Sequence, residues 1–179
     1  DDPVHVKLHA LSPSGETAIA HGDPPQNKPG NPRRLRYVVQ RNQGTDIRSL
    51  FVSLVEPYSS TCQNLKKVSR IDLGLPSEDH SAAAVRVVTT EGRTDLILSS
   101  NEPDRTFDLG NGVQAAGRFV VVSLINQNVT NVFLAAGRSV QFLGGSVTTS
   151  RSEYTGSIVD LQREETGPAW VDTKGDLPA

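Results

Sequence analysis

Short runs of apolar residues recur along the chain at intervals of roughly ten residues, and turn-forming residues separate them. The runs occupy residues 4–11, 33–40, 49–58, 84–89, 95–99, 119–125, 131–135, 139–143 and 157–161. Evidence for helices, an apolar period of 3.6 residues, is nearly absent. The pattern predicts an all-β protein, a single two-sheet antiparallel β-sandwich of about 10–13 strands.

The first run, residues 4–11, alternates apolar and polar side chains. One face of the strand carries its apolar residues: Val4, Val6, Leu8 and Ala10. The other face carries His5, Lys7 and His9. Such alternation predicts a half-buried strand. Because His5 and His9 would lie ~13 Å apart along it, they cannot bind one metal ion together, and neither a metal site nor a cofactor is expected.

Three further segments indicate where the domain has turns and loops and where it ends. Residues 90–93 (TEGR) lie between two runs and predict a hairpin turn. Residues 22–32 contain four prolines, which excludes a central strand. Residues 164–179 are polar and contain an isolated Trp170. We therefore expect a β-sandwich over residues 1–163 and a polar carboxyl-terminal tail over residues 164–179, either docked by Trp170 or frayed.

Composition narrows the class of protein. The 179 residues are 36% hydrophobic, and because the apolar residues concentrate in the strand runs, disorder is not expected. The net charge of -2 does not favour a polyanion-binding surface, so no nucleic-acid partner is expected. No window approaches the ~20 apolar residues of a membrane span. The single cysteine, Cys62, excludes an internal disulfide. Since the chain begins at Asp1 rather than Met, we expect a processed or excised polypeptide.

Seven segments follow one another in an order that resembles the carboxyl-terminal β-sheet region of heparinase II/III-type polysaccharide lyases. They are RRLRYVVQRN (33–42), SLFVSLVEPY (49–58), KKVSRIDL (66–73), AVRVVTTEGRTDLIL (84–98), AAGRFVVVSL (115–124), NVFLAAGRSVQFLGG (131–145) and EYTGSIVDL (153–161). The resemblance extends over residues 4–161. The ending Glu56-Pro57-Tyr58 of the second segment carries most of it, and Glu56 is expected to end a strand there and bond a neighbouring loop.

The resemblance implies a function for the whole enzyme rather than for this chain. Lyases of this type combine a helical toroid with antiparallel β-sandwich domains and cleave acidic polysaccharides by β-elimination. Their catalytic tyrosine and histidine lie on the toroid and on the following sheet domain, neither of which is contained in this chain, so no catalytic residue is assigned here. The implied role is that of a non-catalytic accessory domain, which packs against the upstream catalytic domains of a secreted or periplasmic bacterial protein and flanks an acidic-polysaccharide cleft.

Four residues are candidates for binding substrate. Arg34 and Arg36 alternate on one strand, where guanidinium groups could pair with the carboxylates or sulfates of an acidic polymer. The alternative is that they only cover a solvated or domain-facing side. Tyr154 and Trp170 could stack on sugar rings. These two aromatic residues support an alternative function, that of an independent carbohydrate-binding or adhesion sandwich. Under the accessory-domain reading six residues would form core: Phe51, Leu54, Val55, Val120, Val122 and Phe133.

Overall fold

The computed structural model describes residues 3–25, 29–30, 32–150, 156–163 and 169–175, with side chains described as far as residue 150. Over these residues the chain forms strands and no helix, so the predicted all-β class is confirmed. The strands are β1 (His5–Ala10), β2 (Glu16–Gly22), β3 (Leu35–Arg41), β4 (Ser53–Tyr58), β5 (Leu65–Ile71), β6 (Ala82–Thr89), β7 (Arg93–Ser100), β8 (Phe107–Gly110), β9 (Val113–Ile125), β10 (Asn128–Phe142), β11 (Gly145–Thr148), β12 (Gly156–Arg163) and β13 (Ala169–Gly175).

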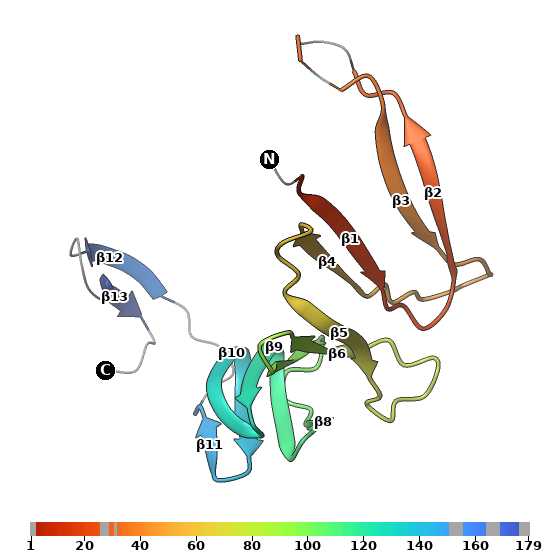
Figure 1. The fold of residues 1–179 in the computed structure, drawn as a ribbon. Coiled ribbons are helices and arrows are strands. Elements are labelled where there is room, and N and C mark those ends of the chain that lie inside the picture. Colours follow the sequence, from red (N-terminus) through yellow and green to blue (C-terminus); the bar gives the residue numbers. More distant parts are fainter. Residues whose placement is uncertain (1–2, 26–28, 31, 151–155, 164–168, 176–179) are drawn as a thin grey trace.

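The strands form antiparallel sheets of very different size. The largest has seven strands in the order β11-β10-β9-β7-β6-β5, with β8 also paired to β9. The remaining strands form two-stranded sheets, β1-β4, β2-β3 and β12-β13. In Figure 1 the β1-β4 pair and the β2-β3 hairpin extend away from the seven-stranded sheet as two arms. The strand count lies within the predicted range, and the antiparallel sheets are consistent with the predicted β-sandwich class.

The hydrophobic core lies on the inner face of the seven-stranded sheet. Leu96 pairs with Val122 and Leu98 pairs with Val120 across β7 and β9, and all four side chains are fully buried. Leu109 of β8 and residues of β5, β6 and β10 complete the same cluster. Burying each such aliphatic side chain stabilises the fold by ~1.5–3 kcal/mol. The described part of the chain is therefore held together chiefly by this sheet.

The long strands β9 and β10 approach closely where two glycines face each other. Gly117 pairs with Gly137, and the register shifts just beyond them, between Gly137 and Ser139. A Cβ atom on Gly137 would lie 2.7 Å from the Cα of Gly117 and 2.7 Å from the carbonyl oxygen of Ala116. Only residues without side chains fit this contact, and the irregularity lets the strands bend around the core.

The structure buries some of the six residues that were expected to form the core and exposes others. Val120 and Val122 are fully buried, and Leu54 is half-buried. Phe51, Val55 and Phe133 are not buried in the chain by itself, since 46%, 61% and 52% of their surfaces are exposed. For Phe133 the reason is strand parity: it pairs with Val121, so it lies on the outer face of the sheet, opposite to Val120 and Val122.

Several local predictions can be compared with the strands. The turn at residues 90–93 joins β6 and β7, as predicted, with Gly92 at a φ of 86°. The proline-rich segment connects β2 and β3, although the sequence pattern had not indicated β2 itself. Strand β13 falls within the expected tail and pairs with β12. The boundary between residues 163 and 164 stays a prediction.

Candidate functional site

The predicted substrate-binding residues are not gathered into one site. Arg34 and Arg36 are both exposed at the start of β3, where Arg36 lies opposite His21. Trp170 belongs to β13, which pairs with β12, but its side chain is outside the described part of the structure. Tyr154 lies outside the described residues. Of the four candidates, the structure therefore shows only the two arginines near each other, two residues apart in the chain and both exposed.

Among the described residues, no group of three or more His, Cys, Asp or Glu side chains is arranged to hold a metal ion. Within the same residues there is no helix long and apolar enough to cross a membrane.

The polar face of β1-β4 contains a buried ionic contact. Glu56 Oε2 lies 2.7 Å from Nε2 of His9, and the glutamate is 5% exposed. On the same face, the rings of His5 and Tyr58 lie 5.4 Å apart. The expectation that Glu56 ends its strand and bonds a loop is wrong, because β4 continues through Pro57 to Tyr58 and the partner of Glu56 lies on a strand. Pro57 is tolerated because the pair has only edge strands.

The opposite face of β1-β4 is apolar and exposed. Val6 pairs with Pro57 and Leu8 pairs with Val55, which places these four side chains on one face. Val6 and Val55 are 69% and 61% exposed. The predicted strand is therefore present, but no side chain of β1 is fully buried: Leu8 and His9, which lie on opposite faces, are half-buried, and Val6 is exposed. We call this face, Val6, Leu8, Val55 and Pro57, the β1-β4 apolar face.

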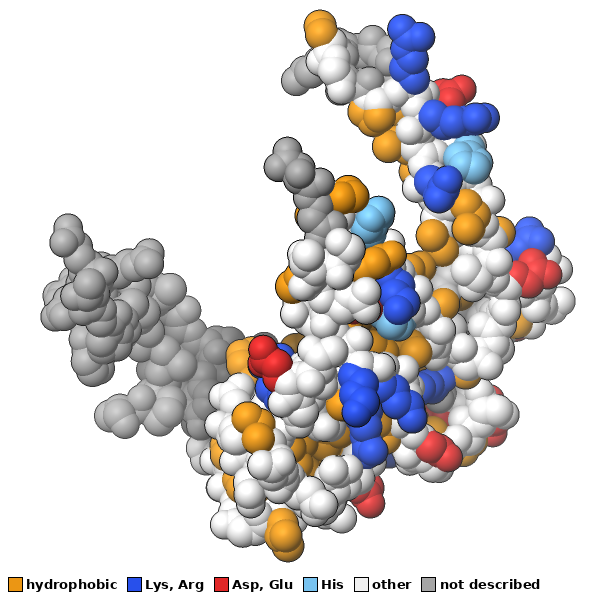
Figure 2. Space-filling view, viewed as in Figure 1, with side chains coloured by type: hydrophobic (Ala, Val, Ile, Leu, Met, Phe, Trp, Pro, Cys, Tyr) orange, Lys and Arg blue, Asp and Glu red, His pale blue; other side chains and the backbone are white. Residues whose placement is uncertain are grey.

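The β2-β3 arm is similarly uncovered. Ile19 pairs with Val38, and Ala20 pairs with Tyr37. All the large apolar residues of this hairpin are substantially exposed: Ile19, Leu35, Tyr37, Val38 and Val39. Figure 2 shows apolar side chains reaching the surface along both arms. These side chains lie on both faces of the hairpin, because Val38 and Ile19 share one face and Leu35, Tyr37 and Val39 share the other.

A pocket of about 440 Å³, lined by both apolar and polar side chains, opens where the loop after β1 approaches the end of β5 and the loop before β6. Ser14, Arg70, Asp72, Asp79 and His80 supply its polar lining. We call it the Arg70 pocket. Its size falls in the range of small-molecule sites, and one arginine beside carboxylates can recognise a ligand that carries both acceptors and donors.

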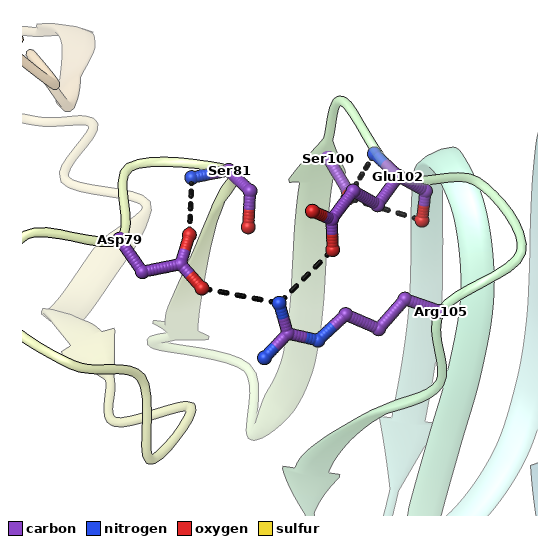
Figure 3. Close-up of polar contacts among 5 residues, drawn as sticks. All are labelled: Asp79, Ser81, Ser100, Glu102 and Arg105. Carbon is purple, nitrogen blue, oxygen red and sulfur yellow. Dashed lines mark hydrogen bonds and ion pairs between the residues drawn. The ribbon is translucent and has the colours of Figure 1, made fainter.

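An ion-pair network secures one wall of the Arg70 pocket (Figure 3). Arg105 Nη1 donates to Asp79 Oδ2 at 3.1 Å and to Glu102 Oε2 at 2.9 Å, which ties together the loops before β6 and after β7. Ser81 donates its backbone N–H to Asp79 Oδ1 at 2.9 Å. Ser81, whose backbone N–H makes this hydrogen bond, and to a smaller extent Arg105 lower the pKa of Asp79 from 3.8 to about 2. The carboxylate is thus ionised over the whole neutral range.

Comparison of the chain with protein-family models, with curated proteins and with solved structures finds no significant match.

Proposed function

We propose that this chain is a non-catalytic β-domain that packs against the catalytic region of the same polypeptide, in a secreted or periplasmic bacterial lyase of the heparinase II/III type. The observation that carries the proposal is the exposed β1-β4 apolar face, with Val6 and Val55 more than half exposed. Burial of apolar surface contributes ~25 cal/mol per Å² removed from water, so another sheet laid on this face would be favoured.

Two features indicate what covers the β1-β4 apolar face. The exposed strands form two-stranded sheets, and a two-stranded sheet is marginally stable until one face packs on a further layer. The order of the strand segments resembles a region that adjoins sheet and toroid domains in acidic-polysaccharide lyases. A sheet or helix face of those upstream domains is therefore the proposed cover, and the acidic-polysaccharide cleft would lie beside it.

Hydrogen exchange on residues 1–179 alone and on the polypeptide with its upstream domains tests this proposal. We expect the amides of β1 and β4 to exchange more slowly in the longer protein. Val6→Lys with Val55→Lys should abolish that protection, whereas Lys7→Gln, on the opposite face, should not. Equal exchange in both proteins would overturn the packing proposal.

Two further measurements separate the alternatives. If the chain alone forms a dimer and the Val6→Lys variant is monomeric, then a second copy of the chain covers the β1-β4 apolar face and the proposal is wrong. If the chain alone produces the ultraviolet absorbance of an unsaturated uronate from an acidic polysaccharide, then the non-catalytic assignment is wrong.

A further inference from the structure

The seven-stranded sheet has an apolar outer face, opposite the face that carries the hydrophobic core. Four apolar side chains lie side by side across this outer face, one from each of β6, β7, β9 and β10: Val85, Ile97, Val121 and Phe133. Antiparallel sheets that face water on one side usually carry polar residues on that side. The apolar row therefore indicates a sheet that is covered on both of its faces.

The chain by itself leaves the β9-β10 part of this outer face uncovered. Phe119 is 42% exposed and Phe133 is 52% exposed, and Ile125 at the end of β9 is 45% exposed. The rings of Phe119 and Phe133 lie 6.2 Å apart in an edge-to-face arrangement. The neighbouring aliphatic side chains on this face are half-buried. We call this surface, Ile97, Phe119, Val121, Ile125 and Phe133, the outer patch.

A groove of about 320 Å³ extends the outer patch toward the segment before β4. Ile97 belongs to the patch and also lines the groove. Ser99, a second lining residue, pairs with Phe119 of the patch. From the segment before β4, Phe51 lines the groove and is 46% exposed. The apolar surface therefore continues from the outer patch into the groove.

We propose that a second copy of this chain covers the outer patch with its own outer patch, in a two-fold symmetric dimer. Phe51, Phe119 and Phe133 are each about half exposed, and because one phenylalanine presents ~200 Å², together they offer ~300 Å² of apolar surface. Ile125 and the half-buried aliphatic residues add to this area. A stable interface buries ~800 Å² per partner, of which ~60% is apolar. The outer patch and its groove supply most of that apolar area, which matches a folded partner rather than a short peptide.

The distribution of charge is compatible with a copy of the same surface. On the outer face of β6, β7 and the paired residues 119–125 and 128–135, charge is confined to Arg93 and Asp95. These two neutralise each other, since Arg93 Nη2 lies 3.1 Å from Asp95 Oδ2. In a two-fold interface a patch meets its own copy, so a patch with one sign of charge would repel itself. Two neutral sheet faces can instead pack ~10 Å apart with their side chains interdigitated, as in a β-sandwich.

Sedimentation equilibrium of residues 1–179 tests the inference. We expect a reversible monomer–dimer equilibrium with a dissociation constant in the micromolar range or below. Phe133→Lys places two like charges in the interface and should weaken the dimer by about 30-fold or more. Because Phe133 is already half exposed, this variant should remain folded, which thermal unfolding checks. Val6→Lys, on the β1-β4 apolar face, is the matched control and should dimerise like the native chain.

Methyl NMR spectra of the native chain give a readout that needs no variant. Between dilute and concentrated samples the methyl signals of Ile97 and Ile125 should shift, whereas those of Ile19 on the β2-β3 hairpin should not. A chain that stays monomeric, unchanged Ile97 and Ile125 signals, or full dimerisation of folded Phe133→Lys would overturn the inference and leave the packing proposal standing. A dimer that is lost in Val6→Lys but kept in Phe133→Lys would overturn both.

Discussion

His9 and Glu56, separated by 47 residues in the chain, meet through Nε2 and Oε2 at 2.7 Å across the β1-β4 pair. The glutamate is almost wholly buried, and its side chain has no other hydrogen-bond partner among the described contacts. The pair therefore fixes which face of this small sheet turns inward.

Replacement of His9 should destabilise the protein more than replacement of His5. His9→Ala leaves the Glu56 carboxylate buried without a partner, so we expect the free energy of unfolding to fall by ~1–3 kcal/mol. His5 is exposed, and His5→Ala should change stability by ~0.5 kcal/mol or less. Urea denaturation of both variants makes the comparison, and equal losses would show that the His9–Glu56 contact does not stabilise the fold.

Asp79 should make stability depend on acid pH. Because its pKa is lowered from 3.8 to about 2 in the folded chain, the unfolded chain binds the proton first as the pH falls. The contribution of Asp79 is fully present above about pH 4 and is lost as the pH falls through about 2. Denaturation midpoints measured across this window should fall less steeply in Asp79→Asn than in the native chain.

Arg105→Gln is the matched variant for that titration. It removes the guanidinium but keeps the contacts of Ser81, which have the larger effect on Asp79. The pKa of Asp79 should therefore rise only part of the way toward its ordinary value, as followed by NMR of the carboxyl group. A complete return to that value would contradict the role assigned to Ser81.

Truncation of Leu98 tests the position of the core. Leu98 is fully buried between β6 and β9, so Leu98→Ala should reduce the free energy of unfolding by ~2–5 kcal/mol. Val6→Ala removes an exposed side chain and should cost no more than ~0.5 kcal/mol in the isolated chain. Chemical denaturation measures both. A large loss for Val6→Ala would mean that the β1-β4 apolar face is already covered.

The close approach of β9 and β10 predicts intolerance of side chains at Gly137. Gly137→Ala places a Cβ atom against backbone atoms on Gly117 and Ala116, and we expect a loss of ~1–3 kcal/mol. At Gly145 the nearest atoms belong to the Phe142 ring, which can rotate, so Gly145→Ala should be milder. Thermal unfolding ranks the two variants, and the reverse order would show that the glycine contact is not required.

The alternation of apolar and polar residues, together with the turn-forming residues between them, determined where most strands lie in the sequence. Local backbone preferences are encoded within a few residues, which is why the hairpin at residues 90–93 and the buried Val120 and Val122 could be predicted. Segment β2 was missed because its alternation, ETAIAHG, is short and rich in alanine.

Only the tertiary structure decided which faces are buried and which distant residues meet. Strand alternation divides residues between two faces but does not say which face contacts the core, so the polar His9 of β1 is half-buried while Phe133 of β10 is exposed. The contact of His9 with Glu56 depends on the pairing register of β1 and β4 and on sheet curvature. Those are set by contacts between segments far apart in the chain, which no local pattern contains.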